Sequence, residues 1–494
     1  MEYRRGVVAR SFLWRLLEKF SVQGLSLFIT FLLARILAPS DYGTIAIVAV
    51  FTTLSIVIID GGLSTALVQK KGADDVDFST IFWGSLVFSF FIYCLLFIAA
   101  PFISDFYNNS ILTLVVRVLS IGIFFQAMNS VQRAYVAKNM LFKKLFYSSI
   151  LALVLSGAVG LYMAINDYGV WALVCLHLCS TIVTTLVMFL TIRWLPYMKF
   201  SLTRFKSLFS YGWKILGINL IVEFYGATRS LIIGKYYSPS SLAFYDRGCS
   251  LPQMLVTNIS SSIQTVIFPA FSDAQDDINK VKHLVRRSVS LTSFLMYPLL
   301  VIICSISKPL ILLLLTEKWL PALPFVWIFS VAYMIVVIQT SSVEAIKAIG
   351  KSRFSLTFET TKVVIGIVVL FITAFYGVIV IAIGTIVCYL LYFLMNIYPN
   401  KLFLNYDIWE QLHDILYPLL FSIFMGGVIY PIQLLYFPPL ITIIIQVFLG
   451  IAVYFMLCHF FKQQSYIYII GIVKDKIKTI HSKSVETRDE STVF

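Results

Sequence analysis

The stretch Arg35-Ile-Leu-Ala-Pro39-Ser40-Asp41-Tyr42 separates two long apolar segments near the start of the chain. A matching stretch, Lys235-Tyr-Tyr-Ser-Pro239-Ser240-Ser241-Leu242, stands 200 residues later and is flanked in the same way. In both, one apolar helix is expected to end and another to begin, because proline costs little at a helix end. The agreement in order, spacing and flanks favours a duplicated helical unit over a loop sequence that recurs by chance.

Apolar stretches dominate the whole chain, which is 59% hydrophobic and 13% charged with a mean hydropathy of +0.89. A helix needs about 20 apolar residues to cross a bilayer. We therefore predict an all-α integral membrane protein with about fourteen transmembrane helices. Their expected spans are 12–37, 43–68, 79–103, 110–133, 147–166, 170–194, 212–236, 243–269, 287–306, 321–345, 356–375, 379–400, 413–433 and 437–460.

The duplication predicts two lobes of six helices each. We expect the N-terminal lobe over 1–205, the C-terminal lobe over 206–405, two extra helices over 406–461, and a polar cytoplasmic tail over 462–494. Because each repeat has an even number of helices, both lobes should have the same orientation in the membrane. This is the parallel kind of repeat, which is found in secondary transporters.

The net charge of +14 is spread unevenly over the connections between these spans. Connections near Asp105, Asp167 and Tyr376 have almost no basic residues, and only Lys308 and Lys318 break the pattern. Such alternation follows the positive-inside rule and predicts that both termini are cytoplasmic. It also argues against nucleic acid as the partner. The basic connections contain Arg4, Arg5 and Arg10; Lys70 and Lys71; Lys138, Lys143 and Lys144; Lys199, Arg204 and Lys206; Lys280, Lys282, Arg286 and Arg287; and Lys351 and Arg353.

Motifs for nucleotide, metal or hydrolytic chemistry are absent from the sequence. There is no P-loop, no His-Glu-x-x-His and no Gly-x-Ser-x-Gly. Cys175 and Cys179 would share a helical face while His177 points away, which argues against a metal site. We predict a transporter that has no cofactor rather than an enzyme.

Charged residues inside the spans are the best candidates for function, because each costs about 2.5–3.5 kcal/mol at a helix centre. In 12–37, Arg15 and Lys19 belong to a polar stripe; they either face a cavity or snorkel to the headgroups with Glu18 as partner. In 212–236, Lys214 lies near the beginning of the span, whereas Arg229 lies near its middle. Snorkelling from the middle is difficult, so a cavity-facing role is favoured for Arg229.

Two further helices contribute polar candidates. Arg117 of 110–133 either pairs with a carboxylate of its own lobe or contacts ligand. Gln253 and Asn258 lie along 243–269 and suit hydrogen bonding to sugars. Several cations facing one cavity suit an anionic ligand, since desolvated arginine and lysine bind phosphate strongly. The candidates for substrate binding are thus Arg15, Lys19, Arg117, Lys214, Arg229, Gln253 and Asn258.

Two carboxylates are candidates for proton or sodium coupling. Asp60 lies within 43–68, and Glu223 lies near the middle of 212–236. A buried carboxylate can be protonated, paired or bound to a cation. Gly61 and Gly62 follow Asp60 and either loosen the helix or permit close packing.

Several sequence segments together resemble a known family. They are Leu33-Ala-Arg35-Ile-Leu-Ala-Pro39-Ser-Asp41-Tyr42-Gly43, Asp60-Gly-Gly62-Leu-Ser64-Thr-Ala66-Leu-Val-Gln69, Ser79-Thr-Ile-Phe-Trp83, Arg117-Val-Leu-Ser120 and Gln132-Arg-Ala-Tyr-Val-Ala137-Lys138-Asn-Met-Leu-Phe142-Lys143-Lys144. The chain resembles the polysaccharide transporter (Wzx-type flippase) family of the multidrug/oligosaccharidyl-lipid/polysaccharide exporter superfamily. Its closest likeness is to exporters of the colanic-acid and teichuronic-acid type, and the second half departs more from the pattern.

This resemblance implies a flippase in the bacterial inner membrane that moves undecaprenyl-diphosphate-linked oligosaccharides by alternating access. Cations would meet the diphosphate, and a polysaccharide polymerase and export proteins would be its partners. Two alternatives stay open: a cation-coupled multidrug exporter of the same superfamily, and a membrane polysaccharide polymerase or ligase. The basic spans and the last two helices argue against the first, and the short outer loops argue against the second.

Overall fold

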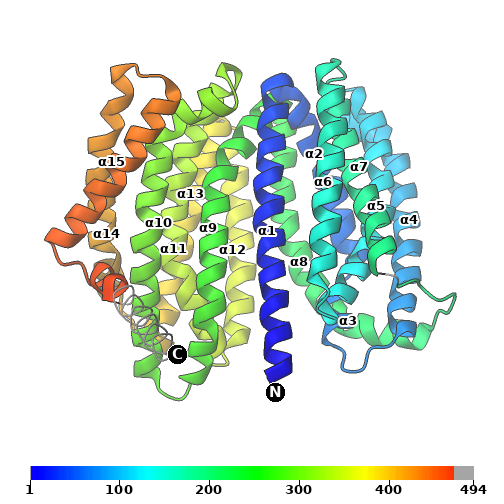
Figure 1. Cartoon of the computed structure of the whole chain (residues 1–494), viewed down its shortest axis with the longest axis horizontal. Helices are drawn as coiled ribbons and strands as arrows, with labels where there is room; N and C mark the ends of the chain where they lie inside the picture. The colour runs from blue at the N-terminus through cyan, green and yellow to red at the C-terminus, as the bar shows by residue number, and fades with distance from the viewer. Residues whose placement is uncertain (1, 193, 472–494) are drawn as a thin grey trace, which may run out of the picture. The chain divides into compact units, whose positions relative to one another are not determined.

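The computed structural model describes residues 2–192 and 194–471 of the chain (Figure 1). Regular structure in these ranges is helical and includes no strand. The predicted polar tail therefore falls outside the described residues from position 472 onward. The described chain divides into two compact units.

The first unit contains the residues up to Tyr245 together with Leu314–Trp319 and Leu370–Val378. The second unit contains Asp246–Leu313, Leu320–Val369 and the described residues from Ile379 onward. The helices of the first unit are α1 (Glu2–Ile36), α2 (Pro39–Asp60), α3 (Leu63–Gln69), α4 (Asp75–Tyr107), α5 (Ile111–Lys138), α6 (Phe142–Ile165), α7 (Val170–Ile192), α8 (Leu202–Tyr236) and the start of α9 (Pro239–Asp273). The remaining helices are α10 (Ile278–Leu314), η1 (Glu317–Ala322), α11 (Leu323–Ala348), α12 (Ser352–Thr373), α13 (Val378–Leu404), α14 (Ile408–Ile429), η2 (Tyr430–Leu435) and α15 (Pro439–Phe460).

The predicted membrane spans agree with these helices. Each of the fourteen expected stretches lies largely on a helix, and the second is divided between α2 and α3. Twelve helical segments of the described residues are long and apolar enough to cross a membrane. The helices α9 and α12, with 35 and 22 residues, are also long enough but are not among the twelve. The all-helical class is confirmed, and the number of crossings stays a prediction.

One face of α6 carries a small residue at every fourth position: Ser148, Ala152, Ser156, Gly160 and Ala164, all of them buried. Residues four apart share a helical face, so these positions form a continuous stripe of small side chains. Both α1 and α7 pack against α6. A Cβ atom at Gly160 would lie 2.9 Å from Leu176 Cδ1 of α7, and one at Gly157 would lie 2.5 Å from Ile29 Cδ1 of α1. Lipid tails are as apolar as side chains, so close packing of this kind is what favours helix association in a membrane.

An ion network ties the beginnings of α4 and α8 together. Asp77, only 1% exposed, accepts hydrogen bonds from Lys70 at 2.7 and 2.8 Å and from Arg204 at 3.3 Å. Arg204 also donates to Asp74, the N-cap residue of α4, and this bond lowers the pKa of Asp74 to about 2. Lys138 donates to the carbonyl of Lys70 at 2.8 Å. Three of the predicted basic connections therefore share one end of the first unit.

The two X-Pro stretches that indicated the repeat meet at the other end of the first unit. Helix α2 begins at Pro39 and α9 begins at Pro239, as the sequence predicts. Their backbones touch, because a Cβ atom at Gly43 would lie 1.7 Å from the carbonyl oxygen of Pro239. Only glycine fits at such a close approach.

The segment Leu314–Trp319 packs onto the same end and caps α1. Lys318 Nζ donates to the carbonyl oxygens of Arg35, Ile36 and Leu37 at 2.6 to 3.2 Å. Trp319, fully buried, donates from Nε1 to the carbonyl of Ala34 at 2.9 Å. These bonds satisfy the last carbonyl groups of α1, which have no partner within the helix. We call Lys318, Trp319 and the carbonyls that they cap the α1 latch.

The core of the second unit includes contacts among α10, α14 and α15. The helices α14 and α15 run side by side (Figure 1). Phe294 and Ile302 of α10 pack against Met425 of α14 and Tyr454 of α15. The Tyr454 hydroxyl donates to the Phe294 carbonyl at 2.9 Å, which fixes α15 to α10. The two helices predicted to lie outside the repeat are therefore built into this unit.

Candidate functional site

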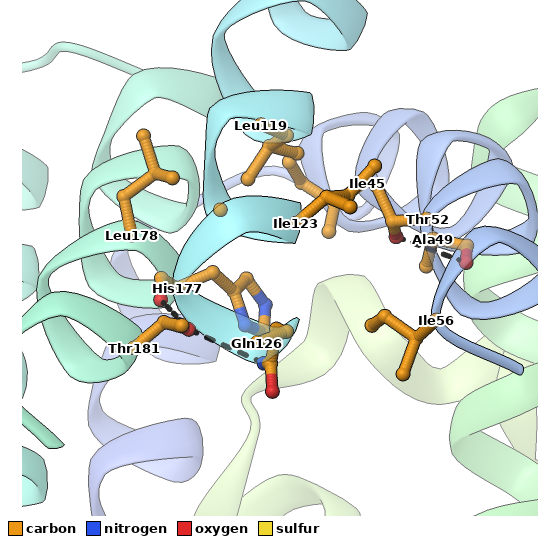
Figure 2. A pocket seen from close by; sticks show the side chains of 11 residues that line it. Ile45, Ala49, Thr52, Ile56, Leu119, Ile123, Gln126, His177, Leu178 and Thr181 are labelled. Atoms are coloured by element: carbon orange, nitrogen blue, oxygen red, sulfur yellow. Dashed lines mark hydrogen bonds between the residues drawn. The ribbon is translucent and has the colours of Figure 1, made fainter. Parts of the chain in front are cut away.

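A cavity of about 120 Å³ opens among α2, α5 and α7 in the first unit (Figure 2). Figure 2 shows His177, Gln126 and Thr181 gathered on one side, with Thr52 of α2 across from them. Most of the other lining residues are aliphatic. The cavity thus presents an imidazole, an amide and two hydroxyls within apolar walls.

Hydrogen bonds between helices hold the polar side of this cavity in place. Gln126 Nε2 of α5 donates to Thr181 Oγ1 of α7 at 3.4 Å, and Asn129 Nδ2 lies 3.5 Å from the Thr181 carbonyl. Thr181 Oγ1 in turn donates to the carbonyl of His177, 2.9 Å away. Because Gln126 uses an amide N–H in this bond, its amide oxygen can accept a hydrogen bond from another partner.

The size of the cavity limits what it can bind. The cavity has room for several waters, but its volume of about 120 Å³ falls below the roughly 300 Å³ at which small-molecule pockets begin. It suits water or a small cation and is too small for a sugar chain. The cavity lining was not found from the sequence, although His177 and Thr181, four residues apart, share a helical face.

The helix break after Asp60 is the second feature of the site. The sequence predicts a continuous helix through Asp60, but α2 ends at Asp60, and Gly61 and Gly62 both adopt positive φ, of 53° and 68°. The Asp60 carboxylate accepts a hydrogen bond from Ser64, whose hydroxyl also lies 3.3 Å from the carbonyl oxygen of Ser130. This corner thus brings together a carboxylate, a hydroxyl and a carbonyl oxygen, which are the ligand types that hard cations prefer.

The break also explains the glycine pair. A Cβ atom at Gly62 would lie 2.5 Å from the carbonyl oxygen of Gly212 on α8. The close-packing interpretation is confirmed at Gly62, and the positive φ angles at the helix break are a reason for both glycines. The contact also brings the corner at Asp60 next to the turn of α8 that carries Lys214.

The charged candidates on α8 differ in exposure. Lys214 is exposed, whereas Glu223 and Arg229 are half-buried. The Arg229 guanidinium lies 5.1 Å from the centre of the Tyr245 ring, a cation–π distance that stabilises a cation away from water. The different exposures agree with the sequence interpretation that a terminal Lys214 reaches solvent more easily than a central Arg229.

The candidates on α1 and α5 have local partners. Arg15 pairs with Glu18 at 2.8 Å and Lys19 is exposed, which confirms Glu18 as the partner of Arg15. Arg117 donates from Nε to the Phe97 carbonyl at 3.3 Å and lies 4.2 Å from the centre of the Phe97 ring. No carboxylate lies within ion-pair distance of Arg117 in the described residues, so its carboxylate partner is not found there.

Gln253 and Asn258 lie on α9 in the second unit. Gln253 is exposed and accepts a weak hydrogen bond from Cys249 Sγ at 3.8 Å. Asn258 is half-buried and its carbonyl accepts from Ser261 and Ser262. Whether these two side chains serve the same ligand as the α8 cations stays a prediction.

Comparison with known proteins places the chain in a family. The family model described as "Polysaccharide biosynthesis protein" matches residues 32–324, more than half of the chain. The chain belongs to this polysaccharide biosynthesis protein family. The resemblance read from the sequence segments is thereby confirmed.

Relatives of this polysaccharide biosynthesis protein have related names. The succinoglycan biosynthesis transport protein ExoT of Rhizobium meliloti is 22% identical over 347 residues, which is 70% of each chain. The teichuronic acid biosynthesis protein TuaB of Bacillus subtilis is 21% identical over 314 residues, 63% of this chain and 64% of its own length. Among solved structures, the lipid II flippase MurJ in an inward closed conformation matches with a TM-score of 0.74 at 17% identity, over 91% of this chain and 98% of that one. The chain shares the MurJ fold.

Proposed function

We propose that this protein is a flippase that moves undecaprenyl-diphosphate-linked oligosaccharide repeat units across the bacterial inner membrane for surface polysaccharide biosynthesis. The supporting observation is the combination of a polysaccharide biosynthesis family with the fold of a lipid II flippase over nearly the full chain. Transport without enzymatic chemistry is part of the proposal. The chain would cross the membrane fourteen times, with both termini in the cytoplasm.

The intramembrane cations receive the diphosphate in this proposal. Arg229 and Lys214 on α8 are the principal contacts, with Arg15, Lys19 and Arg117 as further candidates. A diphosphate that leaves water needs charge-assisted hydrogen bonds, and arginine offers a planar pair of donors. Gln253 and Asn258 would bind the sugars, and the polyprenyl tail would stay in the bilayer while the lobes alternate in access.

Ion coupling is proposed at the corner formed by Asp60. The carboxylate, the Ser64 hydroxyl and the Ser130 carbonyl supply oxygen atoms suited to sodium, and protonation of Asp60 is the alternative way to neutralise it. Glu223 is the second candidate. Transport in proteoliposomes with only a sodium or only a proton gradient tests this, and a flux that neither gradient changes would remove both carboxylates from the proposal.

Reconstituted flipping of a lipid-linked oligosaccharide tests the function directly. Lys214→Ala and Arg229→Ala should each lower flux about tenfold or more, since a charge-assisted hydrogen bond contributes about 1.5–3 kcal/mol. Lys206→Ala, at an exposed lysine near the start of α8, is the matched control and should leave flux unchanged. Arg229→Lys keeps the charge and should retain part of the activity.

The same preparation separates this function from the alternatives. Flux of the lipid-linked substrate in the wild type together with loss in the two alanine variants supports the assignment. Equal flux in Lys214→Ala, Arg229→Ala and Lys206→Ala would show that these cations do not bind the diphosphate. Extrusion of cationic drugs without any lipid-linked flux would favour the multidrug exporter, and glycosidic bond formation would favour the polymerase. A deletion strain should accumulate the lipid-linked oligosaccharide.

A further inference from the structure

The second unit has a polar cavity of about 460 Å³ that is separate from the sites discussed above. It lies where α10, α14 and the helical residues 464–471 meet. Three basic side chains, His283, Arg286 and Arg287, enter it from α10, and Ser290 and Ser465 add hydroxyls. The cavity is nearly four times the size of the one in Figure 2 and is lined by more cationic groups.

A dense ion network forms one wall of this cavity and leaves it net positive. Arg286 donates to both oxygens of Asp414 at 2.7 and 2.9 Å, and to Glu410 at 3.1 Å. Lys282 pairs with Glu410 at 2.8 Å, and the Tyr406 hydroxyl donates to Asp414 at 2.9 Å. The two carboxylates are thus already satisfied by two cations and a hydroxyl. Arg287 is the additional positive charge.

Arg287 is held in an orientation suited to binding an anion. Its guanidinium carbon lies 3.5 Å from the centre of the Tyr468 ring, so the two groups are stacked. Stacking uses the face of the guanidinium and leaves its in-plane N–H groups as donors. Within the described residues, Arg287 has no carboxylate within ion-pair distance. The hydroxyls of Ser290 and Ser465, 2.8 Å apart, lie at the same cavity and can reorient toward a ligand.

The cavity lies at the level where the chain changes from charged to apolar. In α10, uncharged residues follow Arg287 as far as Ser307; in α14 the change follows Asp414. Aromatic residues lie near these positions in the sequence, namely Trp409 and Tyr417 of α14 and Tyr466 and Tyr468. Such a transition with aromatic residues marks the interface between headgroups and hydrocarbon. Basic pockets between helices at this level bind phospholipid headgroups.

We propose that this cavity binds the phosphate of an anionic phospholipid of the surrounding membrane. Arg287 and His283 would meet the phosphate oxygens, and the serines would donate to it. The acyl chains would run along the exposed side chain of Leu295, one turn of α10 beyond the lining residue Leu291. Since α10, α14 and residues 464–471 all contribute, the lipid would hold the end of the described chain against the second unit. Lipid binding at this cavity would not depend on which substrate the protein transports.

Native mass spectrometry and thermal unfolding of the full-length protein test the proposal. Phosphatidylglycerol should bind and raise the melting temperature, whereas phosphatidylcholine should not. Arg287→Gln should weaken phosphatidylglycerol binding about tenfold, the loss of one charge-assisted hydrogen bond pair. Tyr468→Leu removes the stacking partner and should weaken binding by a smaller factor. Lys401→Gln, at a lysine that is 71% exposed elsewhere in the same unit, is the matched control.

Each result decides the matter. Weaker phosphatidylglycerol binding by Arg287→Gln and Tyr468→Leu, with wild-type binding by Lys401→Gln, supports the headgroup site. Equal binding of phosphatidylglycerol by wild type and both cavity variants would overturn it. If inorganic phosphate alone raised the melting temperature as much as phosphatidylglycerol, the cavity would be a site for soluble anions, and the lipid assignment would be wrong.

Discussion

Gly62 shows how much one residue determines in this protein. It lies at the corner that follows Asp60, where the helix stops and restarts as α3. Its φ of 68° is a left-handed conformation, which costs residues with a Cβ atom about 1–2 kcal/mol. Its Cα also faces the carbonyl of Gly212, so the corner can approach α8. Two demands, one on conformation and one on space, therefore meet at a single position.

Substitution of Gly62 separates these two demands. Gly62→Ala should lower the free energy of unfolding by about 1–2 kcal/mol for the φ angle and by about 1–3 kcal/mol more for the clash with α8. Gly72→Ala is the matched control, since Gly72 has a φ of 70° and open space where a Cβ atom would be. Chemical denaturation in detergent measures the free energy of unfolding of both variants. If the two variants lose equal stability, the contact with Gly212 contributes nothing.

The candidate functional residues were found unevenly from the sequence, for a physical reason. Charges within apolar spans, such as Asp60 and Arg229, are visible because the membrane penalises them. The cavity that includes Gln126, His177 and Thr181 was not found, because its lining comes from α2, α5 and α7. Each of these three polar residues is ordinary when taken alone. Sequence periodicity gives the face of one helix, but not which faces meet.

At the scale of the element, close packing of helices in this protein depends on the spacing of small residues. Small residues of α6 recur every four positions and include Gly160, which admits α7; Gly157, beside them, admits α1. In water such a stripe would contribute little burial, whereas in a bilayer it is the means by which helices approach. The stripe accounts for α6 having two close neighbours in the first unit.

Filling the stripe tests this account. Gly160→Leu should lower the free energy of unfolding by about 1–3 kcal/mol, because Leu176 already lies 2.9 Å from where a Cβ atom would stand. Gly24→Leu is the matched control, since a Cβ atom at Gly24 of α1 meets nothing within 4 Å. Thermal unfolding in detergent distinguishes the two. Equal melting temperatures would show that α6 and α7 separate without cost.

Most of the elements could be predicted from the sequence, but not their ends. Hydropathy located the helices because about 20 apolar residues must cross the bilayer. It could not give their full length, since a helix may continue into water: α8 begins at Leu202, ten residues before the expected span, and α10 at Ile278, nine before. It also missed the break between α2 and α3, because a glycine pair in an apolar run looks the same in a bent helix and in a straight one.

At the scale of the whole molecule, the proposed alternating access requires that an end that is closed in one state opens in another. In the first unit the helices α2 and α3 lead from the touching X-Pro stretches to the ion network around Asp77. The first of these ends also carries the α1 latch. The latch residues are joined in sequence to α10 on one side and α11 on the other. The latch therefore ties the end of α1 to the chain segment that connects those two helices.

Breaking the latch should loosen the end of α1 without unfolding the protein. Lys318→Met removes the donor that caps Arg35, Ile36 and Leu37, at an expected local cost of about 2 kcal/mol. Amide hydrogen exchange over 33–37 and 314–319 should rise about 30-fold, since each 1.4 kcal/mol is a factor of about ten. Lys308→Met, at an exposed lysine of α10, is the control and should leave exchange unchanged. Unchanged exchange in both variants would mean that the packing of Trp319 holds the latch and that the lysine is dispensable.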